Sequence, residues 1–288
     1  MGLTLTGAGD GNLTDVKTGS GTLTKSGTGK WTLARNTYTG LTTISAGVLA
    51  VVESQGLGTT AVGTTITSGA SLQIGGNITI GEEALTIRGT GASGMTGALV
   101  NEGGTNNYGG LVTLAADSTI SSDAGTLNIT NTGTITGSTF DLTLAGAGDG
   151  SIASIIGTTT GTLIKTGIGT WSLTGLNTYT GKTFIRSGVL DIKTLKNVSG
   201  GGSSLGAPTT AANGTIDVGS TTTTGTLRFT GTADAASNRV INLAGTTGGA
   251  TLDSSSATNN KIQFASAIHG DGPRRQDSHA HRHKHGCE

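Results

Sequence analysis

The chain has 288 residues, of which 52 are Gly and 56 are Thr, whereas aromatic residues make up 3% and charged residues 12%. So few aromatic side chains exclude a fold built around one aromatic-rich core and favour many small layers filled by Leu, Ile, Val and Ala. The 17 basic and 17 acidic side chains give a formal net charge of zero, which excludes a basic surface for nucleic acid.

Short segments that alternate apolar and polar residues recur along the chain. They include residues 3–5, 78–80, 85–87, 127–129 and 142–144. Alternation with a period of two is typical of short, half-buried β-strands. Gly-rich turns separate the segments, and no longer stretch has the apolar period of a helix. We therefore expect an all-β chain with almost no helix.

A long internal repeat is also present. Residues 21–49 and 161–190 match at 18 of 29 aligned positions, and residues 3–11 and 142–150 match at 8 of 9. The repeating unit is thus about 140 residues long, and self-similarity of this kind is typical of stacked architectures.

Short strands at this spacing fit either a β-sandwich or a β-solenoid. No Pro-rich or charged linker divides the chain into the several domains that sandwiches would need. Outward-facing Thr suits the strand preference of β-branched residues and solvation of the outer surface. We therefore predict a single-stranded parallel β-helix whose two repeat units, residues 1–140 and 141–272, form one continuous solenoid. At about 20 residues per coil, the rod has on the order of 13 coils and is about 60 Å long.

The two copies share a motif of Gly, Lys, Trp, Asn and Tyr at fixed spacing. Its members are Gly21, Leu23, Lys25, Gly27, Gly29, Trp31, Leu33, Asn36, Tyr38, Gly40, Gly47 and Leu49 in the first copy, and Gly161, Leu163, Lys165, Gly167, Gly169, Trp171, Leu173, Asn177, Tyr179, Gly181, Gly188 and Leu190 in the second. This pattern resembles the autotransporter-associated β-strand repeat, found in the passenger regions of type V secreted bacterial surface proteins. The resemblance implies a right-handed parallel β-helix that is exported through an outer-membrane β-barrel and displayed outside the cell. It implies no shared enzymatic activity.

The ends of the chain depart from the full layout of that family. Residues 2–6 already have a strand-like pattern, and neither a leader nor C-terminal barrel strands are evident. We therefore expect the chain to be a piece of a longer protein that is anchored in the outer membrane by its own barrel. Because no apolar run of about 18 residues is present, we expect no direct membrane insertion by this chain.

Four large aromatic residues recur at equivalent positions of the motif: Trp31, Tyr38, Trp171 and Tyr179. An exposed aromatic pair can stack on a sugar ring. Recurrence at equivalent positions instead favours a structural role in the coil, and we predict packing for all four.

The sequence offers little for catalysis or for binding a cofactor. Asp10 and Asp149 lie in matching Gly-rich loops, but one carboxylate per loop is too few for Ca²⁺, so we predict turns. Among the scattered acidic residues of the repeats, only Glu82 and Glu83 are adjacent, and in a strand they would point to opposite faces. No histidine precedes His269 to activate a nucleophile. We therefore expect no enzymatic activity and no cofactor.

The C-terminal segment, residues 273–288, differs abruptly in composition. His279, His281, His283 and His285 alternate and would share one face of an extended segment that could chelate Zn²⁺ or Ni²⁺, with Cys287 nearby. We interpret the segment as a disordered, non-native tail with incidental metal binding.

Together these observations favour a structural and interaction protein, a stalk or adhesive rod from an autotransporter-like passenger at the cell surface or secreted. Expected partners are a host or abiotic surface, glycans, or neighbouring passengers, besides the parent protein's β-barrel. One alternative is a carbohydrate-active β-helix enzyme, a polysaccharide lyase or hydrolase. Another is an ice- or surface-binding solenoid built on Thr arrays, although Lys, Arg and Asp are expected to interrupt those arrays.

Overall fold

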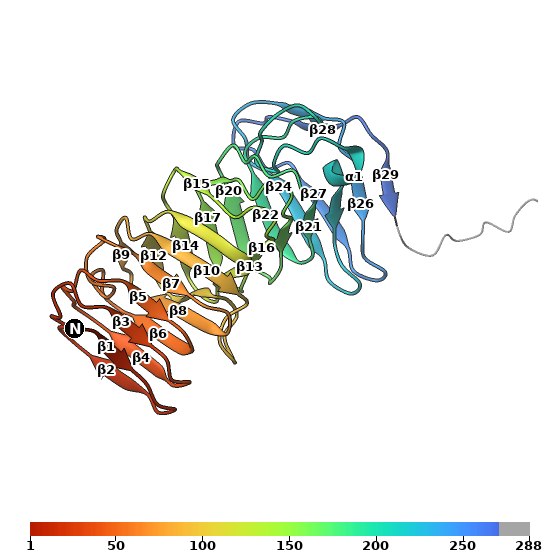
Figure 1. Ribbon diagram of the computed structural model, residues 1–288. Coiled ribbons are helices and arrows are strands. Elements are labelled where there is room, and N and C mark those ends of the chain that lie inside the picture. The colour runs from red at the N-terminus through yellow and green to blue at the C-terminus, as the bar shows by residue number, and fades with distance from the viewer. Residues whose placement is uncertain (271–288) are drawn as a thin grey trace, which may run out of the picture.

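The chain winds into a parallel β-solenoid of about 12 turns, with almost no helix. Residues 1–270 are described in the computed structural model, and Figure 1 shows them as an elongated stack with the N-terminal coil at one end. Leu3 pairs with Leu23, Leu23 with Thr42, and Thr42 with Thr64, so these coils take 20, 19 and 22 residues. The predicted all-β parallel β-helix is thereby confirmed.

Each coil passes through three positions, which we call the first, second and third faces. Strands on the first face are β1 (Leu3–Leu5), β3 (Leu23–Lys25), β5 (Thr42–Ile44), β7 (Thr64–Ile66), β10 (Leu85–Gly89), the first part of β13 (Val112–Ser122), β15 (Thr134–Ile135), β18 (Ile155–Ile156), β25 (Ala235–Ser237) and β28 (Ile262–Phe264). Strands on the second face are β2 (Gly11–Leu13), β4 (Lys30–Leu33), β6 (Gly47–Val51), β8 (Ala70–Gly75), β11 (Leu99–Gly103), the second part of β13, β16 (Leu142–Ala145), β19 (Leu163–Lys165), β21 (Thr183–Ile185), β23 (Ile216–Val218), β26 (Ile241–Leu243) and β29 (Ile268–Gly270).

The third face contains an eight-stranded parallel sheet. Its strands are β9 (Thr79–Ile80), β12 (Thr105–Tyr108), β14 (Thr126–Ile129), β17 (Asp149–Ile152), β20 (Thr170–Leu173), β22 (Gly188–Ile192), β24 (Gly225–Phe229) and β27 (Ala250–Asp253). The four-residue helix α1 (Ala211–Gly214) interrupts the long connection from β22 to β23. Among the described residues, no helix has the length and hydropathy that a membrane span requires.

Aliphatic side chains from successive coils stack in register to form the core. On the second face, Leu49 pairs with Leu72, Leu72 with Leu99, and Leu99 with Ile120, and all four side chains are fully buried. Full burial of one such side chain contributes about 1.5–3 kcal/mol relative to its exposure. Because every coil adds a layer of this kind, the core extends along the rod as the composition predicts.

The two copies of the motif occupy different faces. In the first copy β3 lies on the first face and β4 on the second, whereas in the second copy the equivalent β19 lies on the second face and β20 on the third. The repeat of about 140 residues is therefore not a whole number of coils. Outward side chains at equivalent positions of the two copies consequently face different directions, while the local turn is the same. Gly47 and Gly188 have φ values of +65° and +66° at this turn, a left-handed conformation that favours glycine.

Candidate functional site

The motif lysines lie inside the solenoid, at the corner between the first and second strands of each motif copy: β3 and β4 in the first copy, β19 and β20 in the second. Both Lys25 and Lys165 are fully buried. The Nζ of Lys165 donates to the carbonyl oxygens of Thr166 at 2.7 Å, Gly167 at 2.8 Å and Ser187 at 3.1 Å. Burial lowers the pKa of Lys165 to about 8, with partial compensation from the charge of Asp149.

Lys25 has the equivalent arrangement in the first copy. Its Nζ donates to the carbonyl oxygens of Gly27 and of Ala46, the latter at 3.0 Å. Burial lowers the pKa of this lysine as well. The ammonium group thus joins two successive coils through their backbone carbonyls, and it has no open surface from which to contact a ligand.

The four motif aromatics lie within their own copies and are not brought together. Tyr38 and Tyr179 are fully buried, and their hydroxyls bond to Thr42 at 2.7 Å and to Thr183 at 2.8 Å. Burial raises the pKa of each tyrosine to about 12.

The two tryptophans differ in exposure. Trp171 is fully buried and donates from Nε1 to the carbonyl oxygen of Ala145 at 3.0 Å, whereas Trp31 is half-buried. Gly150 in the preceding coil is paired with Trp171, and a Cβ at Gly150 would lie 2.6 Å from the indole ring. The glycine that is paired with each Trp in the preceding coil is therefore required, because the indole ring packs directly on it.

Asp10 and Asp149 each accept a backbone hydrogen bond from the next coil. Oδ1 of Asp10 accepts from the amide of Lys30 at 2.8 Å, and Oδ1 of Asp149 accepts from the amide of Thr170 at 2.9 Å. In the described part of the chain, no group of three or more His, Cys, Asp or Glu side chains is arranged to hold a metal ion. The four tail histidines and Cys287 lie outside the described residues.

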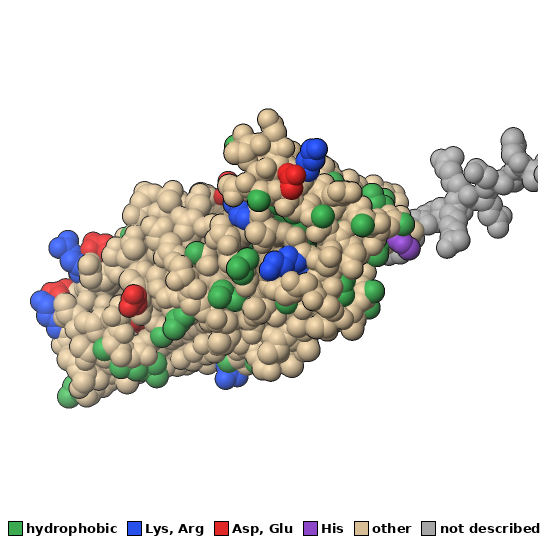
Figure 2. Space-filling view, turned by 90° about the horizontal axis from the view of Figure 1, so that it is seen from above, with side chains coloured by type: hydrophobic (Ala, Val, Ile, Leu, Met, Phe, Trp, Pro, Cys, Tyr) green, Lys and Arg blue, Asp and Glu red, His purple; other side chains and the backbone are tan. Residues whose placement is uncertain are grey.

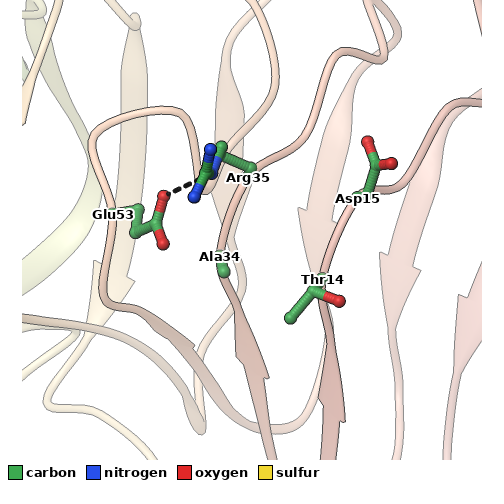
Figure 3. A pocket seen from close by; sticks show the side chains of 5 residues that line it. All are labelled: Thr14, Asp15, Ala34, Arg35 and Glu53. Atoms are coloured by element: carbon green, nitrogen blue, oxygen red, sulfur yellow. Dashed lines mark ion pairs between the residues drawn. The ribbon is translucent and has the colours of Figure 1, made fainter.

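Near the N-terminal end, a surface pocket of about 370 Å³ is lined by Thr14, Asp15, Ala34, Arg35 and Glu53 (Figure 3). Nε of Arg35 is 3.1 Å from a carboxylate oxygen of Glu53, and the side chains are 76% and 41% exposed. Asp15 forms its own ion pair with the neighbouring Lys17, at 2.8 Å. Each of the two carboxylates that line the pocket is therefore engaged by a separate cation.

Glu83 is the buried member of the adjacent acidic pair, while Glu82 is exposed. Its Oε1 accepts from the hydroxyl of Thr64 at 2.8 Å, and its backbone carbonyl accepts from the hydroxyl of Tyr108 at 2.8 Å. Burial raises the pKa of Glu83 to about 6. Because Glu83 is only 2% exposed, this perturbed acid is shielded from any surface substrate.

A polar ladder runs along the outside of the third face. One outward position in each strand aligns in register over eight coils and is occupied in turn by Thr79, Asn107, Asn128, Ser151, Ser172, Asp191, Arg228 and Asp253. A groove of about 350 Å³ lies on this ladder, lined by Thr126, Asn128, Asp149, Gly150, Ser151, Thr170, Ser172 and Arg228. The strands β14, β17, β20 and β24 thus contribute to one concave polar surface, and β22 lies between β20 and β24 in the sheet.

The first face has a ladder of threonines. Thr4, Thr24, Thr43, Thr65, Thr86, Thr113 and Thr136 pair in sequence across seven coils. The prediction that charged residues interrupt the Thr arrays is wrong for this face. The coils vary in length, so the alignment arises from strand register and not from a fixed residue spacing.

Charged side chains are scattered over the surface seen in Figure 2 and do not gather in one large patch. The Lys182–Asp217 pair, at 2.7 Å, is one of several ion pairs that neutralise neighbouring charges. This distribution agrees with the zero net charge of the chain.

Comparison with protein families identifies the passenger-associated-transport-repeat at residues 23–51 and 163–192, the two copies of the motif. The resemblance to an autotransporter passenger repeat is therefore confirmed at both places. The repeat implies a passenger-associated role and a surface or secreted location. Comparisons with curated proteins and with solved structures give no significant match.

Proposed function

We propose that this chain is a non-catalytic stalk or adhesive rod within the passenger of an autotransporter-like bacterial surface protein. The observation that carries the proposal is that the passenger repeat occurs twice, at residues 23–51 and 163–192, in one solenoid. The second-face strands of this solenoid pair without a break from β2 to β29. Each coil contacts mainly its neighbours, so folding can propagate coil by coil as a chain emerges from a pore. The ligands of such a rod would bind its outer surface.

Fusion of residues 1–270 between an export leader and an outer-membrane β-barrel tests this function. We expect the segment to reach the cell surface folded, because its coils need no disulfide and each coil pairs mainly with the adjacent coils. Labelling by an antibody on intact cells, followed by protease treatment, measures display and folding. Retention of the fusion in the periplasm would contradict the proposal.

A matched fusion carrying Ile120→Asp is the control, because a charge in the fully buried second-face core prevents coil stacking. This variant should be degraded or retained in the periplasm.

The purified segment is also assayed on acidic polysaccharides, where the proposal expects no depolymerisation. Cleavage that a single carboxylate substitution abolishes would favour the carbohydrate-active alternative.

The Thr ladder favours a second candidate function, binding to an ordered surface such as ice. Seven hydroxyl-bearing side chains recur at the spacing of neighbouring parallel strands, about 4.8 Å. This candidate predicts thermal hysteresis that Thr65→Lys, at the centre of the ladder, reduces severalfold. Thr143→Lys, on the second face, should leave it unchanged. Absence of hysteresis in the unmodified chain rejects this candidate.

A further inference from the structure

Hydrogen bonds along the third-face ladder have a defined direction in its first half. The hydroxyl of Ser151 donates to Oδ1 of Asn128 at 2.7 Å, and Nδ2 of Asn128 donates to Oδ1 of Asn107 at 3.0 Å. Nδ2 of Asn107 then donates to the hydroxyl of Thr79 at 3.1 Å. Every donor in this segment therefore points toward the N-terminal end of the solenoid.

The direction reverses between β17 and β20. The hydroxyl of Ser172 donates to Oδ2 of Asp191 at 3.0 Å, toward the C-terminal end. Ser151 and Ser172 are paired residues of adjacent coils, and in the described structure no hydrogen bond joins their hydroxyls. A serine hydroxyl has one proton and two lone pairs. Both oxygens have thus donated their proton away from each other, and their lone pairs remain available at the groove.

Other groups in the groove add acceptors and one cation. The carboxylate of Asp149 uses Oδ1 for the amide of Thr170, and no hydrogen bond is formed by its Oδ2 among the described residues. Nε of Arg228 is buried, lies 3.6 Å from Oδ1 of Asp191 and has no hydrogen-bond partner in the same residues, whereas the side chain as a whole is 31% exposed. The groove therefore combines several free acceptors with a guanidinium donor at one side.

We propose that this groove binds the hydroxyl groups of a neutral glycan. The inference deepens the proposed function and rests on it, since it assigns a ligand class to the outer surface of the rod. Sugar hydroxyls can donate to Ser151, Ser172 and the Asp149 carboxylate. They can also accept from Arg228, so one ligand type satisfies both kinds of group.

Charge and size favour the same ligand. The groove lining contains one carboxylate, Asp149, and one guanidinium, Arg228, so it has no net positive charge to attract an acidic glycan. The volume of about 350 Å³ is within the range of roughly 300–1,000 Å³ typical of small-ligand sites. Because the ladder repeats at about 4.8 Å, an extended chain lying along the rod axis meets similar groups at successive coils.

Titration of the folded chain with cellohexaose, laminarihexaose and mannohexaose tests the proposal, with hexagalacturonate as the acidic comparison. We expect at least one neutral hexasaccharide to shift the backbone amide resonances of residues 126–128, 149–151 and 170–172. The combined substitution Ser151→Val and Ser172→Val should weaken that binding about tenfold, since two hydrogen bonds of modest net strength are lost. Valine retains the strand preference of the site.

Two further variants separate binding from folding. Thr126→Arg fills the groove without removing any ladder hydrogen bond and should also abolish the shifts. Thr86→Val, at a half-buried outward position of the first face, should bind like the unmodified chain. Binding only of hexagalacturonate, unchanged affinity in the double variant, or no shift with any neutral glycan at millimolar concentration overturns the proposal. Those outcomes leave the surface-display test unaffected, so the two failures are distinguishable.

Discussion

Replacement of Arg239 by alanine is expected to lower the free energy of unfolding by about 4 kcal/mol. The side chain is 1% exposed. Its Nη1 donates to the carbonyl oxygen of Leu205 at 2.6 Å, Nη2 donates to that of Gly206 at 3.0 Å, and Nε donates to that of Lys196 at 3.1 Å. Alanine leaves these carbonyls without their donors and creates a cavity.

The effect should be concentrated in the long connection between β22 and β23. Arg239 holds two points of this connection, Lys196 and residues 205–206, so its loss should loosen the segment that leads to α1. Urea unfolding measures the free energy, and hydrogen exchange should show lost protection in residues 193–215. Arg239→Lys retains the charge but not the planar fork of donors, and an intermediate loss is expected.

Arg88→Ala is the matched control, because Arg88 is exposed on β10. Its effect should stay within about 0.5 kcal/mol. A loss below about 1 kcal/mol for Arg239→Ala would show that the connection is held by its other contacts.

The strands and their inward residues were predictable because period-two alternation is a local property. Leu23 and Lys25 flank Thr24, and the structure places both of them inside and Thr24 outside. The same alternation could have shown that Lys25 points inward, since it shares the side of Leu23. The unusual burial of a charge was missed because a lysine in a polar stretch is normally assigned to the surface.

The faces and their ladders could not be predicted from one sequence. The step from Leu85 to Val112 is 27 residues, whereas that from Leu3 to Leu23 is 20, so no single residue period locates the next coil. A loop inserted between β10 and β11 produces this difference. The face on which each strand lies depends on where such loops end. For this reason the Thr ladder could not be recognised from the sequence, in which charged residues separate the threonines. For the same reason the two copies of the motif occupy different faces.

The groove on the third face exists only because of the pairing register between successive coils. Asn128 and Arg228 are 100 residues apart in the sequence, yet strand pairing places them on one ladder. Neither residue belongs to the motif, and no local pattern marks them as neighbours. Among the side chains that line the groove, the sequence pattern singles out only Asp149, which it predicts to lie in the turn of a Gly-rich loop.

Lys165 should make the stability of the solenoid rise with pH. Its pKa in the folded chain is about 8, below the ordinary lysine value of 10.5. Between these two values the unfolded chain binds more protons than the folded chain, so the free energy of unfolding increases as pH rises. At pH 7 both states are protonated, and the folded state bears the full cost of burying the charge.

The experiment compares the unmodified chain with Lys165→Met by urea unfolding at pH 7 and at pH 10. Methionine has similar length and carries no charge, so the contribution of Lys165 is the change in the difference between the two proteins. We expect the unmodified chain to gain about 2–3 kcal/mol relative to the variant over this range. The buried tyrosines titrate higher and act alike in both proteins, so their contribution cancels.

Lys261→Met provides the control, because Lys261 is an exposed lysine whose side chain lies outside the core. Its difference from the unmodified chain should remain constant between the two pH values. If the Lys165→Met difference is equally constant, the ammonium is solvated in the folded chain and does not bridge the two coils. If it follows the expected rise, the motif lysine is a buried charge that the three backbone carbonyls of its corner hold in place.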